Sequence, residues 1–207
     1  TSLIVFLAAR IHARDVSLRR LLAVRPIAPL HALLSLAAGA GLCPLLSTID
    51  DLVQRRWPVD DPEMTQSLQK IVSSASPVAL VVAALVVMPV ARELFFRGLL
   101  YVGVRRRAGV QSALLVSAAC YACASLQWQQ MPTLLVLGLA TAWLCERTGT
   151  VISAVVAQLA YGAVQGVPIL RGADPMADVT YPTRWIVGGA VIALLALVAV
   201  GAGRREE

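Results

Sequence analysis

The sequence predicts an all-α membrane protein, a polytopic bundle of about seven transmembrane helices. Of its 207 residues, 58% are hydrophobic and only 14% are charged, whereas a soluble domain carries about 25% charged residues. Long apolar runs recur along the whole chain, and no strand-like alternation competes with them. Within a bilayer only helices and closed barrels satisfy the backbone hydrogen bonds, so these runs are expected to be helices.

The predicted spans follow from the runs that approach the roughly 20 residues that a bilayer core requires. Residues 1–9 are apolar but too short to span, so we interpret them as the end of a helix and expect the N-terminus to be truncated. The longer apolar runs are residues 28–49, 78–104, 110–128, 131–146, 150–168 and 185–203. Residues 1–207 are therefore expected to form a single membrane domain, with a short interfacial helix at 62–76.

Basic residues mark one side of this arrangement. They gather in alternate loops, as Arg10, Arg14, Arg19, Arg20 and Arg25, as Arg105, Arg106 and Arg107, as Arg147, and as Arg204 and Arg205. The intervening loops, 50–77 and 169–184, mix acidic and basic residues. The positive-inside rule then predicts that the basic side, with the C-terminus, faces the cytoplasm. We expect the membrane to be a bacterial inner membrane. The net charge of +6 is explained by these clusters, so the bilayer and not nucleic acid is the expected partner.

The sequence gives little support for a metal or cofactor. Cys120 and Cys123 have C-x-x-C spacing, but no second such pair or nearby histidine accompanies them. We interpret them as small residues that pack on one turn of a buried helix. The two histidines, His12 and His31, lie near the N-terminus and outside the charged segment described next. No cofactor and no metal site are predicted.

Three charged residues interrupt the apolar run 86–107: Arg92, Glu93 and Arg97. Glu93 and Arg97 are four residues apart, which places them on one helix face at pairing distance. An unpaired charge inside a membrane is costly, so we expect these two side chains to form an ion pair. Arg92 projects about 100° away around the helix, so it needs another partner or must extend to the cytoplasmic headgroups.

The stretch "ARELFFRGLLY" resembles the first motif, Glu-Glu-x-x-x-Arg, of the CPBP family of CAAX proteases and bacteriocin-processing proteins, also called Abi or Rce1-like. Two later stretches occupy the places of the second and third motifs: "ALLVSAACYACASLQ" and "LGLATAWLCERTGTVISAVVAQLAYGA". The resemblance covers about residues 78–165. It implies a helical membrane core of the kind found in these intramembrane endopeptidases.

The resemblance carries over position by position. The retained positions are Glu93, Arg97 and the aromatic Tyr121. The replaced positions are Arg92 for the first glutamate, Ser125 and Gln158 for two histidines, and Gly162 for an asparagine. In the family the first glutamate is implicated as the base that activates water, and a guanidinium cannot take that role. The resemblance therefore implies a degenerate member in which no catalytic residue is expected.

We hypothesise a catalytically inactive protein that serves as a subunit, scaffold or binding module for another membrane protein or a peptide. One alternative is a divergent endopeptidase that uses Glu93 with Ser125 or Gln158, although an arginine partner weakens Glu93 as a base. Another is a small transporter component, although no inverted repeat is present.

Gln158 lies in mid-span and needs a polar partner, for which Tyr121, Ser125 and Arg92 are the candidates. Glu146 and Arg147 are expected in a solvated or interfacial turn at the cytoplasmic end of a helix.

Overall fold

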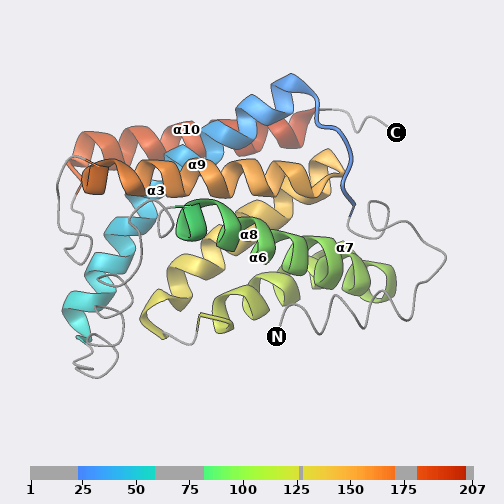
Figure 1. Cartoon of the computed structure of the whole chain (residues 1–207), viewed down its shortest axis with the longest axis horizontal. Coiled ribbons are helices and arrows are strands. Elements are labelled where there is room, and N and C mark those ends of the chain that lie inside the picture. The colour runs from blue at the N-terminus through green and yellow to red at the C-terminus, as the bar shows by residue number, and fades with distance from the viewer. Residues whose placement is uncertain (1–22, 59–81, 126–127, 171–180, 204–207) are drawn as a thin grey trace.

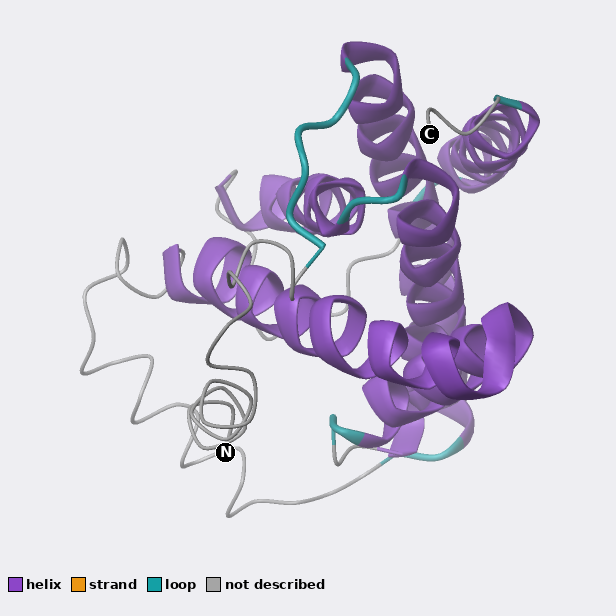
Figure 2. Ribbon diagram, turned by 90° about the vertical axis from the view of Figure 1, so that its right-hand side faces the viewer, coloured by secondary structure: helices purple, strands orange, loops and turns teal. Residues whose placement is uncertain are grey.

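The computed structural model describes residues 23–58, 82–125, 128–170 and 181–203. Within these ranges the protein is all-α, as predicted, and no strand is present (Figures 1 and 2). The helices are α3 (Pro29–Arg56), π-helical η1 (Ala83–Val87), α6 (Met88–Glu93), π-helical η2 (Leu94–Tyr101), α7 (Val102–Cys123), 3₁₀-helical η3 (Trp128–Gln130), α8 (Met131–Thr148), α9 (Val151–Leu170) and α10 (Thr183–Ala202).

Every predicted span after the first overlaps one of these helices. By length and composition, three described stretches are able to cross a membrane: Pro29–Arg56, Val151–Pro168 and Thr183–Ala202. Residues 1–9 and the expected interfacial helix at 62–76 lie outside the described residues. The chain is thus a membrane protein with several spanning helices, and the number seven stays a prediction.

Helix α3 ends later than predicted. A loop was expected from residue 50, but the helix continues to Arg56. Asp51 forms an ion pair with Arg55 one turn later, at 2.7 Å, and Asp50 accepts a hydrogen bond of 3.0 Å from the Thr133 hydroxyl of α8. These partners allow the two aspartates to remain in helical structure at the end of a long apolar segment.

A helix that runs from Ala83 to Ala108 through η1, α6, η2 and the start of α7 carries the first motif, and we call it the motif helix. It alternates between α- and π-helical hydrogen bonding. It ends at Gly109, whose φ of 81° and ψ of 178° are accessible almost exclusively to glycine. This break lies in the predicted connection between the spans 78–104 and 110–128.

Close backbone contacts hold α3 against α9 and α10. A side chain at Gly39 would place its Cβ atom 1.9 Å from the Ala157 carbonyl oxygen, and one at Gly41 would come within 2.5 Å of the Gly189 oxygen. Small residues at such crossings let membrane helices pack on backbone atoms. Helix α8 packs against the resulting layer of α3, α9 and α10.

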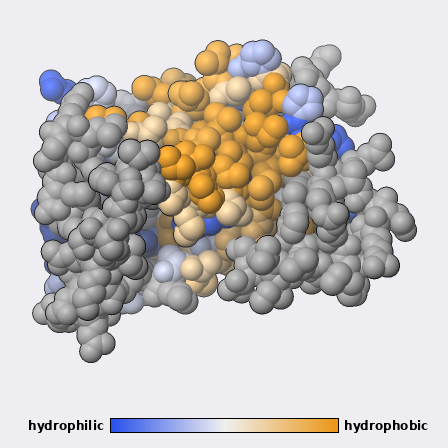
Figure 3. Space-filling model, in the orientation of Figure 1, coloured by the Kyte–Doolittle hydropathy of each residue, from blue (hydrophilic) through white to orange (hydrophobic). Residues whose placement is uncertain are grey.

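The surface agrees with a position in the bilayer. Apolar side chains cover the middle of the face in Figure 3, and hydrophilic side chains lie toward its two ends. Helix α10 alone exposes Val187, Val191, Ile192, Leu194, Leu195 and Val198 by half or more. This surface is consistent with lipid contact.

Candidate functional site

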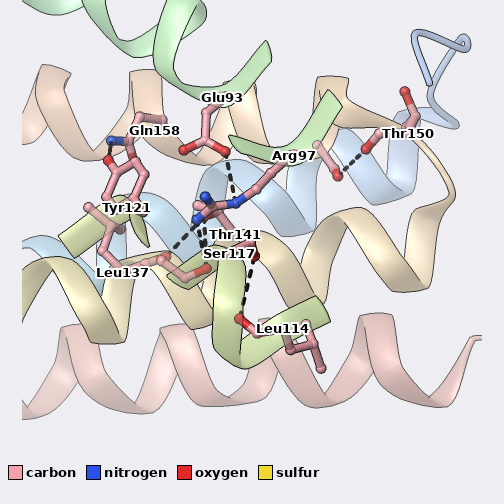
Figure 4. Close-up of polar contacts among 11 residues, drawn as sticks. Glu93, Arg97, Leu114, Ser117, Tyr121, Leu137, Thr141, Thr150 and Gln158 are labelled. Carbon is pink, nitrogen blue, oxygen red and sulfur yellow. Dashed lines mark hydrogen bonds and ion pairs between the residues drawn. The ribbon is translucent and has the colours of Figure 1, made fainter. Parts of the chain in front are cut away.

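The charged residues of the motif helix lie in the interior of the bundle. The side chains of Glu93 and Arg97 are both 0% exposed, and Arg97 Nε lies 3.3 Å from Glu93 Oε2 (Figure 4). The ion pair predicted from their spacing is therefore confirmed. Arg97 Nη2 also donates to the Gly138 carbonyl oxygen at 2.7 Å and to Thr141 Oγ1 at 2.6 Å. Arg97 thus connects the motif helix to α8.

Tyr121 of α7 lies at the centre of the site. The guanidinium carbon of Arg92 is 4.3 Å from the centre of its ring, and that of Arg97 is 4.7 Å away. The ring of Phe96 meets it edge to face at 5.3 Å. Arg92 therefore finds an aromatic partner within the bundle, and the electron-rich ring stabilises both cations.

Gln158 of α9 contacts the same tyrosine. It is 6% exposed, and its Nε2 donates a hydrogen bond to the Tyr121 hydroxyl (Figure 4). Tyr121 was one of its three predicted partners. The site thus joins side chains from three segments that are far apart in the sequence: the motif helix, the second half of α7, and α9.

The two remaining motif positions are occupied differently. The Ser125 hydroxyl donates to the Ala122 carbonyl oxygen at 2.9 Å, at the end of α7. Gly162 of α9 is buried, and a Cβ atom there would lie 3.3 Å from Leu85 Cδ2 of η1. The position where the resemblance places an asparagine is therefore closely packed by a leucine.

Glu146 is buried in α8, so the prediction of a solvated or interfacial turn was wrong for this residue. The residue is 6% exposed, and its carboxylate accepts a 2.5 Å hydrogen bond from the Tyr101 hydroxyl. Arg105 binds the same carboxylate, with Nε 2.7 Å from Oε2 and Nη2 3.0 Å from Oε1. Tyr101 and Arg105 are four residues apart and thus face α8 together. That spacing was the one available signal for this network. Arg147 is half-buried and lies 5.3 Å from the ring of Trp143.

The two cysteines of the C-x-x-C pair are not buried as predicted, and His31 lies away from the motif residues. Cys120 and Cys123 are exposed on α7 and not buried, because Tyr121 between them occupies the inward face. His31 lies at the start of α3 beside Gly203 at the end of α10, not among the motif residues; His12 lies outside the described residues. Within the described ranges, no three His, Cys, Asp or Glu side chains are grouped to hold a metal ion.

The motif positions offer three kinds of polar group: a carboxylate, a guanidinium and an amide. The one carboxylate among the motif residues, Glu93, is enclosed and paired with Arg97, so a water molecule has no direct access to it in this state. The adjacent position holds a permanent cation, Arg92. Gln158 offers an amide, which donates and accepts hydrogen bonds but takes no proton near neutral pH.

Residues 74–164 match the family model described as Type II CAAX prenyl endopeptidase Rce1-like. The matched range contains every motif position discussed above and confirms the family resemblance found in the sequence. No match was found among curated proteins or among solved structures.

Proposed function

We propose that the chain, whose residues 74–164 match the Rce1-like family of type II CAAX prenyl endopeptidases, is a catalytically inactive member of that family. Its function would be to bind another membrane protein or a peptide as a subunit, scaffold or binding module. The position of Arg92 carries this proposal. It stands where the family resemblance places the catalytic base, and its guanidinium is committed to the ring of Tyr121.

The neighbouring contacts support the loss of activity. For Glu93 to act as a base it would have to leave Arg97, and separating a buried ion pair costs about 3–5 kcal/mol. Arg97 is itself anchored to α8 by two further hydrogen bonds.

The packing around Gly162 supports the same conclusion. Leu85 lies against this glycine and also against Gly166. An asparagine at position 162 would require Leu85 to move. The space beside position 162 is thus filled by an apolar side chain.

We further propose a bacterial inner membrane location with the C-terminus in the cytoplasm. Two of the basic segments meet in the structure: Val151 N, just after the turn that follows Arg147, donates to the Ala23 carbonyl oxygen beside Arg25 at 3.2 Å. The ends of the motif helix and of α10 lie toward the same side in Figure 1. A shared basic end is the arrangement that the positive-inside rule assigns to the cytoplasm.

The direct test uses the purified chain in lipid nanodiscs with a farnesylated CAAX peptide and with unmodified membrane peptides, read by mass spectrometry. The wild-type chain is expected to give no more product than empty nanodiscs. A Glu93→Gln variant is the matched control, because it alters the one motif carboxylate. Cleavage by the wild type that disappears in Glu93→Gln would contradict the proposal and establish the divergent peptidase.

A further inference from the structure

The charges around Tyr121 do not balance. Two arginines, Arg92 and Arg97, face its ring, and Glu93 is the acidic group beside them. Glu93 forms an ion pair with Arg97 and interacts more weakly with the charge of Arg92, which forms no direct ion pair of its own among the described residues. The cluster carries one net positive charge, which is costly to hold in a membrane interior without a counter-charge.

Arg92 also has unused hydrogen-bonding capacity. Its Nη2 atom is buried and has no hydrogen-bond partner in the described part of the chain. The same is true of Gln158 Oε1, of both carboxylate oxygens of Glu93, and of Nε and Nη1 of Arg97. The arginine side chain as a whole is partly exposed. The guanidinium therefore lies at the boundary between the packed interior and the outer surface of the bundle.

The outer surface beside Arg92 is apolar. Val87 and Met88, one turn earlier on the motif helix, are 56% and 59% exposed, and Ala91 is exposed as well. The small side chain of Ala91 permits another helix to approach the backbone closely. This surface of Val87, Met88 and Ala91, next to Arg92, is here called the α6 face.

The position of Arg92 along the motif helix separates it from lipid phosphates at the basic end of that helix. Arg92 precedes Arg105, the first of the basic cluster, by thirteen positions. At the α-helical rise of 1.5 Å this corresponds to at most about 20 Å along the axis, because η2 within this stretch is π-helical and rises less per residue. An arginine side chain does not extend far enough to bring a lipid phosphate at that end within hydrogen-bond distance.

We propose that the α6 face docks a transmembrane helix of a partner protein, and that this helix carries an Asp or Glu near the middle of its span to pair with Arg92. The inference rests on the proposed function and specifies the chemistry of the partner for the same site. A carboxylate matches the fork of a guanidinium. It also neutralises the excess charge, in the way that ionisable residues within membranes pair with one another.

The test measures binding of a synthetic helix to the full chain in nanodiscs of uncharged lipid. The probe is a fluorescent 20-residue leucine–alanine transmembrane peptide with one central Glu, and its control carries Gln at that position. Energy transfer to a label on the chain reports the affinity. The Glu peptide is expected to bind about tenfold more tightly than the Gln peptide.

Variants of the chain test whether Arg92 is the source of the preference for the Glu peptide. Arg92→Leu should abolish it, and Arg92→Lys should keep part of it because the charge remains. Arg106→Leu, which removes an exposed arginine outside the site, should leave it unchanged. Arg92→Leu removes an unpaired charge, so loss of folding is not expected, and circular dichroism checks this. Equal binding of both peptides, or a preference that survives Arg92→Leu, would overturn the proposal.

Two additional measurements distinguish an intact partner helix from a lipid ligand and from a cleaved peptide. Oleate supplies a carboxylate on a lipid, and Arg92-dependent binding of oleate without a preference for the Glu peptide would overturn the partner-helix proposal. Mass spectrometry of the bound peptide tests the proposed function independently. Intact peptide supports both proposals, whereas a cleaved but Arg92-dependent peptide would retain the docking site and refute the inactive assignment.

Discussion

Two buried glutamates, Glu93 and Glu146, each pair with an arginine of the motif helix, yet the two networks differ in kind. Glu93 and Arg97 belong to the same helix, and both side chains are 0% exposed. Glu146 belongs to α8, and its partner Arg105 lies on the motif helix with 43% of its side chain exposed. The first network is local and enclosed, while the second joins two helices near their basic ends.

This difference determines what each network stabilises. The Glu93–Arg97 contact holds no two helices together by itself, and the connection to α8 comes from the other donors of Arg97. The Glu146 network connects helices directly, and its arginine retains access to water or headgroups. Enclosure makes removal of one partner costly, whereas exposure allows the remaining charge to be solvated.

The largest effect is expected from Arg97→Leu. It would leave the Glu93 carboxylate buried without its partner and remove both hydrogen bonds to α8, so the free energy of unfolding should fall by about 3–5 kcal/mol. Thermal unfolding of the detergent-solubilised protein measures this. The double variant Glu93→Leu with Arg97→Leu should recover part of the loss, because no charge remains unpaired. If the double variant is no more stable than Arg97→Leu, the cost of the isolated carboxylate is not the cause.

A smaller effect is expected from Glu146→Gln. The amide retains a hydrogen bond to Tyr101 but loses the charge-assisted contacts with Arg105, so unfolding should become easier by about 1–3 kcal/mol. The same unfolding assay applies. Arg105→Leu, the opposite half of the pair, tests whether the buried acid or the exposed base dominates. Arg105→Leu should lower the free energy of unfolding more than Glu146→Gln does, because it leaves a buried carboxylate without its cation. Equal losses of stability in the two variants would contradict the argument.

The contrast between a pair within one helix and a pair between two helices also explains which contacts could be predicted from the sequence. The Glu93–Arg97 pair was predictable because a spacing of four sets the geometry without knowledge of the fold. Glu146 pairs across 41 positions, and only the packing of α8 on the motif helix brings it to Arg105. The positions of the helices followed from hydropathy, while the end of α3 did not, because Asp50 is satisfied by Thr133 from another helix.

The candidate site shows this limit as well. The family motifs identified Arg92, Tyr121 and Gln158 as one group, and Tyr121 as a possible partner of Gln158. The ring contact of Arg92 and the filling of the Gly162 position by Leu85 depend on how the motif helix packs against α7 and α9. Neither residue spacing nor composition contains that information. The outward direction of Cys120 and Cys123 was missed for the same reason.

Thr141→Val separates the two roles of Arg97. It removes one acceptor of Arg97 Nη2 while the Gly138 carbonyl oxygen and Glu93 remain, so a loss of about 1–2 kcal/mol is expected. Thr141→Ser keeps the hydroxyl and serves as the matched control, with little loss. A similar loss in both variants would instead indicate that the threonine methyl group, and not the hydrogen bond, stabilises this contact between helices.

The smallest effect is expected at the ring that the two arginines share. Tyr121→Phe removes the hydroxyl that Gln158 contacts but keeps the aromatic face, so the loss should be about 0.5–1.5 kcal/mol in the unfolding assay. Tyr121→Leu removes the face as well and should cost more, because Arg92 and Arg97 both lie over it. Tyr121→Leu would therefore remove both the hydrogen bond with Gln158 and the ring that stabilises the two arginines. If Phe and Leu at this position are equally destabilising, the ring does not stabilise Arg92, and the enclosed network ends at the Glu93–Arg97 pair.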